Sequence, residues 1–283
     1  MKHFYIITNQ IKDPEFETTK WIENYLKQRH IGCIVHVQED CQGRYYTDSR
    51  QIPPETDCIL VLGGDGTLLE AARDTAQLDI PLIGVNLGTL GYLAEVEKAN
   101  LTEALEQLCR DDYQIDRRMM LTGSVRRNHG VVLENEALND VVISRNGPLQ
   151  VIHFRICVNG HFLKKYSADG IIVSTPTGST GYNLSAGGPI VEPNASLMVI
   201  TPICPHTLNT RSIVLSPEDR IEIEIGPAGS GRVQEVEANF DGSHSIPMRT
   251  GDKIEISRSL KTTSIIRLSD VSFLEVLHKK MGE

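Results

Sequence analysis

Apolar residues in the first third of the chain form short continuous runs that are separated by longer, more polar stretches. In chain order, we expect a strand at 4–8, a helix at 15–29, strands at 34–37 and 58–62, a helix after Thr67, a strand at 80–85 and a helix at 101–110. Strands that alternate with helices predict a parallel sheet covered by helices. Ligands of such sheets bind beyond the carboxyl ends of the strands.

After about residue 112 the pattern changes to short β-branched runs, among them 221–225 and 253–257, and many of these runs alternate in polarity, as 221–225 does. Asn159-Gly160 and Asp241-Gly242 are signals for hairpin turns. This part therefore predicts an all-β domain, either a sandwich or a barrel. We expect an α/β domain over 1–111 and an all-β domain over 112–260. The segment 261–283 includes an amphipathic helix at 271–280 and is expected to pack back on the first domain.

Composition excludes several classes of protein. The 283 residues are 40% hydrophobic and 23% charged, which is typical of a globular protein with one large or two ordinary domains. The net charge of −9 predicts no bulk attraction to nucleic acid or to an anionic membrane. No apolar run approaches the roughly 20 residues that span a bilayer. The six cysteines show no C-x-x-C spacing, so we expect reduced thiols, no zinc site and a cytoplasmic location.

The turn Gly63-Gly64-Asp65-Gly66-Thr67 lies between a predicted strand and a predicted helix. Glycines in such a turn let backbone N–H groups approach a phosphate, and the helix N-terminus adds partial positive charge. A carboxylate repels phosphate, so Asp65 needs a reason to be there. It could accept a proton from an attacking hydroxyl or help to hold a metal ion. The alternative is a structural corner in which Asp65 is the helix N-cap.

A second segment, 167–189, is rich in hydroxyls and glycines and carries no charge after Asp169. Such a density of donors suits a sugar, a phosphate or a base edge, and Tyr182 could supply a stacking face. The alternative is an ordinary Ser/Thr/Gly loop.

Three further features of the sequence are candidates for ligand contacts. Asn139-Asp140 begins an apolar run and could be a strand-entry turn, or an amide that reads a base edge beside a carboxylate that holds ribose hydroxyls. Asn86 ends a predicted strand and could face the same cleft as the glycine-rich turn. Arg73 is expected to be a surface charge of the following helix, and a phosphate contact is the less favoured alternative.

With these motifs in their order and approximate spacing, the chain resembles the NAD kinases over roughly residues 58 to 277. The GGDG turn is shared with diacylglycerol, sphingosine and phosphofructo-kinases, whereas the segment 175–188 is more particular to NAD kinases. The motifs that carry the resemblance are Gly63–Thr67, Asn86–Leu93, Asn139-Asp140, Asp169-Gly170, Ser174–Gly188, Pro205–Leu208, Arg211-Ser212 and Asp241-Gly242.

The resemblance implies a Rossmann-like first domain, a β-sandwich second domain that binds a dinucleotide, and an active site between them. It implies transfer of a phosphoryl group from ATP or polyphosphate to the adenosine-ribose 2′-hydroxyl of NAD, which makes NADP. It also implies Mg²⁺ held mainly through substrate phosphates, and a homo-oligomer, either a tetramer or a dimer.

Residue roles follow from the same resemblance. Asp65 is the implied proton acceptor, with Gly66 beside it at the nucleotide. Asn139 and Asp140 are implied to hold the adenosine, and Asp169 to reach the nicotinamide end. The implied lining of the dinucleotide pocket includes Thr177, Thr180, Gly181, Tyr182 and Ser185. Nucleotide contacts are also expected from Gly63, Gly64, Thr67, Asn86, Asn183, Leu184 and Asp241.

Two departures from the family pattern leave the choice between NAD and NADH open. Ser167 stands where bacterial members often have a basic residue, and Ser243 stands where many have glutamine.

Three other functions compete with an NAD kinase: a lipid kinase, which would not need the 175–188 segment; a sugar kinase, which would need a basic cluster; and a non-catalytic dinucleotide sensor, against which Asp65 argues.

Overall fold

The computed structural model describes residues 1–40, 45–88, 91–128, 130–147, 151–207, 210–229 and 231–282. The chain forms two compact units. One consists of Met1–Arg118 and Thr262–Glu283, and the other of Met119–Lys261. Two strands, β8 (Gln114–Arg127) and β19 (Lys253–Arg267), contribute residues to both units.

The first unit is built on a parallel sheet with strand order β6-β5-β1-β2, and the end of β19 pairs with β6 through Ile265 and Leu82. The sheet registers place Phe4 opposite both Cys33 and Cys58. Its further elements are β1 (His3–Thr8), α1 (Glu17–Lys27), β2 (Gly32–Val37), β3 (Glu39–Asp40), β4 (Tyr45–Tyr46), the 3₁₀ turn η1 (Ser49–Gln51), β5 (Cys58–Gly63), α2 (Asp65–Thr75), β6 (Leu82–Asn86), β7 (Val96–Glu97), the 3₁₀ turn η2 (Lys98–Asn100), α3 (Leu101–Cys109) and α5 (Phe273–Met281).

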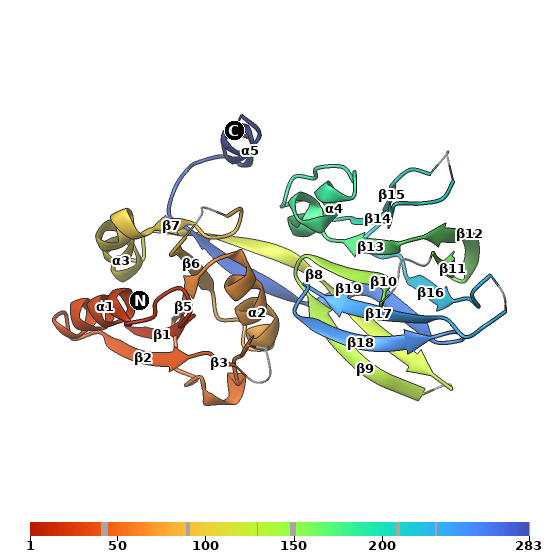
Figure 1. Cartoon of the computed structure of the whole chain (residues 1–283). Helices are drawn as coiled ribbons and strands as arrows, with labels where there is room; N and C mark the ends of the chain where they lie inside the picture. Colours follow the sequence, from red (N-terminus) through yellow and green to blue (C-terminus); the bar gives the residue numbers. More distant parts are fainter. Residues whose placement is uncertain are drawn as a thin grey trace. The chain divides into compact units, whose positions relative to one another are not determined.

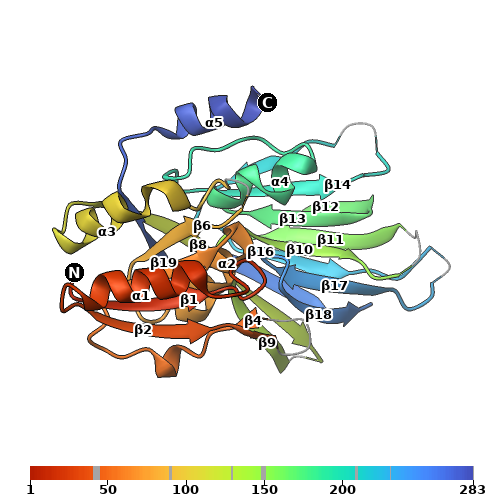
Figure 2. The ribbon, with the colours of Figure 1, turned by 60° about the vertical axis from the view of Figure 1, so that its left-hand side comes forward.

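Both faces of this sheet are covered, which explains why β5 is apolar along its whole length. On one face, Ile22 and Leu26 of α1 and Leu105 of α3 pack against Ile6 and Leu60 of the strands. On the other face, α2 packs on β5 and β6. Figure 1 shows α1 and α3 on one side of the strands and α2 on the other, and Figure 2 shows α1 lying along β1.

The second unit is a sandwich of two sheets. One sheet has the order β15-β14-β13-β10-β17-β18, and the other contains β12-β11-β16-β19 together with β8 and β9. The further elements are β9 (Gly130–Ala137), β10 (Asp140–Arg145), β11 (Ile152–Val158), β12 (His161–Ala168), β13 (Gly170–Ser174), the 3₁₀ turn η3 (Thr177–Thr180), α4 (Tyr182–Ser185), β14 (Met198–Ile203), β15 (Ile213–Leu215), β16 (Ile221–Ile225), β17 (Glu235–Phe240) and β18 (His244–Arg249).

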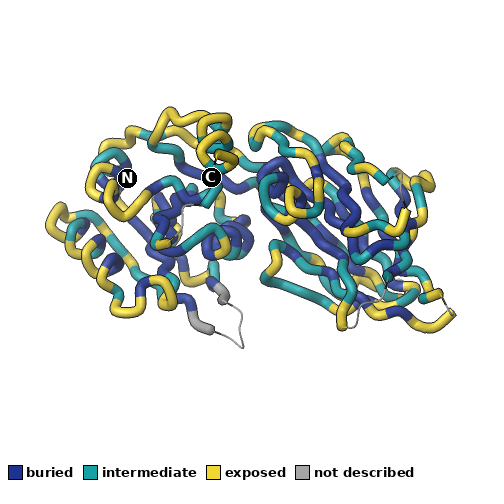
Figure 3. Tube along the Cα trace, turned by 45° about the horizontal axis from the view of Figure 1, so that its top comes forward, coloured by how far each residue is buried: buried dark blue, intermediate teal, exposed yellow. Residues whose placement is uncertain are grey.

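The core of the sandwich collects the inward residues of both sheets, such as Ile143, Val173 and Ile200 from one and Ile156 and Ile223 from the other. In β16, burial alternates residue by residue, as its sequence predicts. Figure 3 shows the buried strand interiors in dark blue.

Both predicted hairpin turns are present. Asn159 and Gly160 have φ of 52° and 77° between the antiparallel strands β11 and β12, and Asp241 and Gly242 have φ of 50° and 70° between β17 and β18. Asn, Asp and Gly tolerate this left-handed region better than other residues, so these sequences favour the turns they form.

The α/β first part, the β-sandwich second part and the return of the C-terminal helix to the first unit confirm the predicted fold class. The short strands β3, β4 and β7 were not predicted, nor were β8 and β15, and β19 runs on to Arg267, beyond the predicted strand at 253–257. Within the described ranges, no helix combines the length and the apolar character needed to cross a membrane.

Candidate active site

The glycine-rich turn occupies the carboxyl end of β5, as predicted. Gly64 is the N-cap of α2 and is extended, with φ of −122°, and Asp65 is the first residue of the helix. The alternative that Asp65 caps the helix is therefore wrong. Gly63 has no room for a side chain, because a methyl group there would overlap Thr67. At Gly64 and Gly66, by contrast, a methyl group would meet nothing within 4 Å, so the backbone there is open to a ligand.

The Asp65 carboxylate is held by a loop that follows β6. Its Oδ2 accepts a hydrogen bond from the backbone N–H of Tyr92 at 2.7 Å, and its Oδ1 accepts from Leu93 and Ala94, each at 3.2 Å. A carboxylate has about four acceptor positions, two on each oxygen. Donors among the described residues use three of these positions, and the fourth is on Oδ2.

Gly91 makes this approach possible. A methyl group at residue 91 would overlap the carboxylate of Asp65, so the loop could not close on the turn with any larger residue there. The sequence places Gly91 in a motif but does not predict this role. The signal was a second glycine-rich stretch after a neighbouring parallel strand. Residues 89 and 90 of that motif lie outside the described part of the chain.

Asn86 and Thr67 serve the geometry of the same region. The buried Asn86 side chain closes a turn, because its Oδ1 accepts from the N–H of Gly88 at 2.9 Å and its Nδ2 donates to the carbonyl of Gly88 at 3.2 Å. Thr67 Oγ1 accepts from Asn9 Nδ2 at 3.2 Å, which ties the loop after β1 to the turn after β5. Asn86 also lines a cavity of about 810 Å³ to which Lys12 and Lys98 contribute.

Arg73 was expected on the surface, and this expectation is wrong. Its side chain is 8% exposed and forms an ion pair with Asp74, which is 5% exposed, at 3.0 Å. Asp74 also accepts from the N–H of Thr47 at 2.9 Å. One turn away, burial raises the pKa of Glu70 to about 7, although Arg73 opposes that shift. The reason for the error is that the helix face carrying Arg73 is covered by chain that is distant in sequence.

In the second unit, Asp241 holds the turn that leads into β10. Its carboxylate accepts hydrogen bonds from the backbone N–H groups of Leu138, Asn139 and Asp140 at 2.8, 2.7 and 3.1 Å. In return, the N–H of Asp241 donates to the carbonyl of Asp140 at 3.1 Å. Asp241 therefore fixes the backbone of both candidate adenosine-binding residues.

Asp140 is 4% exposed at the start of β10. Burial, with the nearby Asp241 carboxylate adding to it, raises the pKa of Asp140 to about 7. Its side chain, with those of Asn139, Tyr182 and Asn239, lines a cavity of about 380 Å³. The amide oxygen of Asn139 is buried and has no hydrogen-bond partner among the described residues.

The segment after β13 packs tightly on this turn. A methyl group at Gly178 would overlap the Asn139 carbonyl, and Thr175 donates its hydroxyl to the carbonyl of Leu138 at 2.6 Å. Within the described part of the chain, the hydroxyl oxygen of the buried Thr177 has no partner, like the amide oxygen of Asn139. Since buried polar atoms usually find partners, these two atoms suit a bound ligand.

The other predicted residues of this segment fall into two groups. Tyr182, Leu184 and Ser185 are exposed on α4, and Thr180 and Gly181 are half-buried. Asn183 is fully buried and is used internally: its Nδ2 donates to the carbonyls of Ser179 and Pro189, and its Oδ1 accepts from Thr201.

Asp169 and Ser167 each contact a basic or imidazole side chain of the second unit. Asp169 Oδ1 lies 3.5 Å from Arg145 Nη1, and both side chains are about a quarter exposed, at 26% and 27%. Ser167, where a basic residue is common in the family, contacts His153 with 2.8 Å between the hydroxyl and Nδ1. An imidazole therefore lies beside the position that lacks the basic side chain.

Comparisons with known proteins decide the family. The ATP-NAD kinase N-terminal domain matches residues 45–113, and the ATP-NAD kinase C-terminal domain matches residues 138–268. The chain belongs to the NAD kinase family. Members of this family are phosphotransferases that make NADP from NAD.

Relatives match the whole chain. The NAD kinase of Lachnospira eligens is 47% identical over 293 residues, covering 99% of this chain and all of the relative. The NAD kinase of Agathobacter rectalis is 46% identical over 285 residues, covering 100% of this chain and 99% of the relative.

Solved structures support the same fold. A yeast NADH kinase complexed with NADH superposes with a TM-score of 0.80 at 23% identity, covering 99% of this chain and 87% of that one. An NAD kinase from Archaeoglobus fulgidus in complex with ATP superposes with a TM-score of 0.72 at 25% identity, covering 93% of this chain and 92% of that one.

Proposed function

We propose that this member of the NAD kinase family transfers the terminal phosphoryl group of ATP, or of polyphosphate, to the 2′-hydroxyl of the adenosine ribose of NAD, with Asp65 as the proton acceptor. The observation that carries the assignment is the hydrogen bonding of Asp65. Three loop amides orient its carboxylate and, as far as the described residues go, leave one acceptor position on Oδ2. That position is available to the proton of an incoming hydroxyl.

The reaction then needs little from the protein beyond placement. As the ribose oxygen forms its bond to the terminal phosphorus, its proton passes to Asp65 Oδ2. The bond between that phosphorus and the bridging oxygen of the donor breaks, so ADP, or the shortened polyphosphate, leaves with that oxygen. A fixed carboxylate pays no reorganisation cost at that moment, so positioning supplies much of the rate. The open backbone at Gly64 and Gly66, at the N-terminus of α2, is the proposed cradle for phosphate oxygens.

The second unit supplies the proposed grip on the dinucleotide. Asn139 and Asp140 line the 380 Å³ cavity and are assigned to the adenosine, with Tyr182 as a stacking face. Thr177, Thr180, Gly181, Leu184 and Ser185 are assigned to the same ligand, and Asp169 to its nicotinamide end. Asp241 and Asn183 act indirectly in this proposal, because their side-chain contacts are made within the protein.

We assign a divalent ion, Mg²⁺, to the donor phosphates. Among the described residues, no three His, Cys, Asp or Glu side chains cluster in a way that could hold a metal. Mg²⁺ bound to a nucleotide keeps most of its ligands from phosphate and water, so it needs no dedicated cluster of protein ligands. When bound, the ion would neutralise charge on the transferring group.

The setting of the enzyme is also a proposal. Cys33, Cys58, Cys109, Cys157 and Cys204 are free thiols, which fits a reducing compartment such as the cytoplasm. We propose a homo-oligomer, a tetramer or a dimer, on the basis of the family resemblance.

Asp65→Asn tests the assignment of the proton acceptor. Formation of NADP from ATP and NAD is followed by liquid chromatography, and NAD binding is followed by calorimetry. Loss of a general base is worth about 10²- to 10⁴-fold in rate, so kcat should fall by that factor while the Kd for NAD stays within about threefold. A folded Asp65→Asn variant with the wild-type kcat would show that Asp65 is structural. Replacing ATP with polyphosphate in the same assay identifies the donor.

A further inference from the structure

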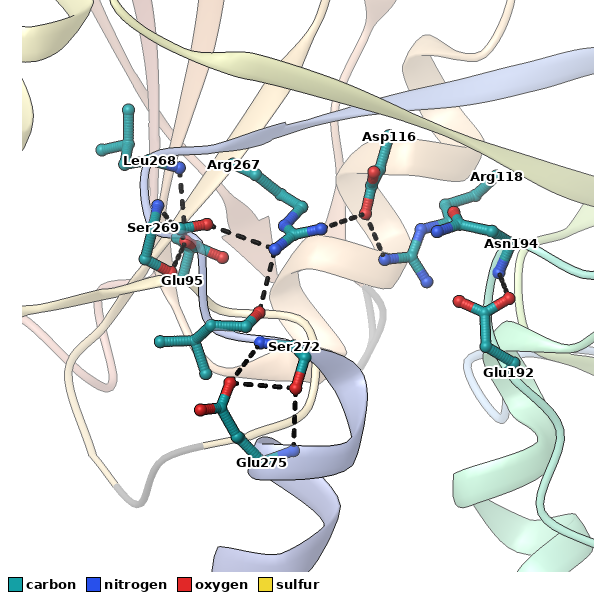
Figure 4. A network of polar contacts seen from close by, with 11 residues as sticks. Glu95, Asp116, Arg118, Glu192, Asn194, Arg267, Leu268, Ser269, Ser272 and Glu275 are labelled. Carbon is teal, nitrogen blue, oxygen red and sulfur yellow. Dashed lines mark hydrogen bonds and ion pairs between the residues drawn. The ribbon is translucent and has the colours of Figure 1, made fainter.

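The loop that holds Asp65 is itself held from its other end. Its residues 92–94 donate their N–H groups to the Asp65 carboxylate, and the next residue is Glu95. Glu95 Oε1 accepts hydrogen bonds from the N–H of Leu268 at 3.2 Å, the N–H of Ser269 at 3.0 Å and the hydroxyl of Ser269 at 2.7 Å. Figure 4 shows these contacts gathered around one carboxylate.

The partners of Glu95 are fixed in turn. Arg267 Nη2 donates to the carbonyls of Ser269 at 3.2 Å and Val271 at 2.9 Å, and its Nη1 lies 3.8 Å from Asp116. Asp116 also pairs with Arg118 at 3.0 Å. Glu95 is therefore attached to a braced stretch of chain rather than to a loose tail.

The helix that follows touches the same loop. Ser272 and Glu275 form a capping box at the start of α5, which begins the helix at a defined residue. In its last turn, Lys280 Nζ lies 5.5 Å from the centroid of the Tyr92 ring, within the range of a cation–π contact. No residue of α5 is buried, so its attachment depends on polar and cation–π contacts more than on a hydrophobic face.

The exposed contacts of Ser269 contribute little to global stability. Ser269 is exposed, and hydrogen bonds and ion pairs at exposed positions contribute little to the free energy of unfolding. Their consequence is geometric. Residues 92–94 of the loop are bonded to Asp65 of the glycine-rich turn, and residue 95 is bonded to the C-terminal segment. A loop released at one anchor would let the Asp65 carboxylate change its orientation.

We propose that Glu95 is a positioning residue for phosphoryl transfer, and that the C-terminal segment 268–280 is a support that keeps the loop 91–95 closed on Asp65. The proposal rests on Asp65 being the proton acceptor. Glu95 is proposed to touch no substrate and to act through the N–H groups of residues 92–94, which hold the Asp65 carboxylate.

The test compares Glu95→Ala with Glu95→Gln and, as a matched loss of charge in the same segment, with the exposed Asp270→Ala. Steady-state kinetics, melting temperature and amide hydrogen exchange over residues 91–95 are measured for each. In Glu95→Ala, we expect kcat to fall about tenfold, since small displacements of catalytic groups have effects of about this size or larger. The KM for NAD should stay within about threefold, the melting temperature should change little, and the amides of residues 92–94 should exchange faster.

Glu95→Gln should recover most of the rate, because its amide oxygen can still accept from Leu268 and Ser269. Asp270→Ala should match the wild type in all three measurements. A kcat for Glu95→Ala within about twofold of the wild type, or an equal loss in Asp270→Ala, would overturn the proposal. Should Glu95→Ala fail to fold, Ser269→Ala, which removes only the hydroxyl donor, takes its place with an expected fall in kcat of about two- to threefold.

Asp65→Asn, measured in parallel, distinguishes a failure of the proposed proton acceptor from a failure of the proposed support by Glu95. An active Asp65→Asn would refute the proton acceptor itself. An inactive Asp65→Asn together with a fully active Glu95→Ala would refute only the supporting role of the C-terminal segment.

Discussion

Asp65 and Asp241 make the same local contact in different units of the chain. Each carboxylate accepts hydrogen bonds from three successive backbone N–H groups of a distant loop, 92–94 for Asp65 and 138–140 for Asp241. Each aspartate is followed by a glycine. In the first unit the held loop orients the carboxylate, and in the second unit the carboxylate orients the held residues. The consequences of disturbing the two contacts should therefore differ.

Gly91→Ala should impair catalysis by forcing the loop away from Asp65, because the added methyl group would overlap the carboxylate. We expect kcat to fall about 10- to 100-fold, with the Kd for NAD nearly unchanged. Gly130→Ala is the matched control, since its methyl group would meet only the Arg127 carbonyl, at 3.7 Å. Steady-state kinetics of both variants decide the point, and wild-type turnover in Gly91→Ala would contradict the assigned close approach.

Asp241→Asn should weaken substrate binding more than chemistry. The asparagine presents one acceptor oxygen where the aspartate has two, so at least one N–H of residues 138–140 loses its partner, at a cost of about 1–3 kcal/mol in the free energy of unfolding. With Asn139 and Asp140 less fixed, we expect the KM for NAD to rise about tenfold. Asp219→Asn alters another turn aspartate, which accepts from Ser216 and Asn159, and should leave this KM unchanged. A change confined to the KM for ATP would contradict the assignment.

Asp140→Asn should stabilise the protein at neutral pH. The pKa of Asp140 is raised to about 7 by burial and by Asp241, above the ordinary value of 3.8. The folded state then binds a proton that the unfolded state has released, so wild-type stability falls as pH rises between about 4 and 7. The uncharged amide escapes this loss. We expect its advantage in the free energy of unfolding to grow over that window to at most about 4 kcal/mol, measured by urea denaturation at pH 5, 6, 7 and 8. An advantage that does not vary with pH would contradict the cause assigned here.

Arg73→Met should destabilise the first unit without a direct effect on substrate binding. Removing one partner of a buried ion pair leaves the Asp74 carboxylate with the Thr47 amide and without its countercharge, at a cost of about 3 kcal/mol or more in the free energy of unfolding. The double variant with Asp74→Leu should recover much of this loss. Chemical denaturation of the three proteins measures it, and a rise in the KM for ATP in the folded single variant would revive the phosphate contact.

Much of the fold follows from local sequence. The apolar run of β5 and the polar alternation of β16 predict their positions, and Asn159-Gly160 predicts its turn because both residues tolerate positive φ. β19 was predicted only as far as residue 257 because the residues that follow are mostly polar. Leu260, the apolar residue among 258–263, is fully exposed in the structure. That extension depends on pairing with other strands.

The sequence by itself also determined the position of the glycine-rich turn to which we assign the reaction chemistry, because such a turn after a buried strand can be recognised without any contact partner. Only the tertiary structure decided what each side chain does there. The amides that hold Asp65 are 27 to 29 residues away along the chain, and those that hold Asp241 are more than 100 residues away. The burial of Arg73 and the support of the loop by Glu95 likewise depend on contacts across the fold. Hydrogen bonds and desolvation act between neighbours in space, and local sequence patterns describe only neighbours along the chain.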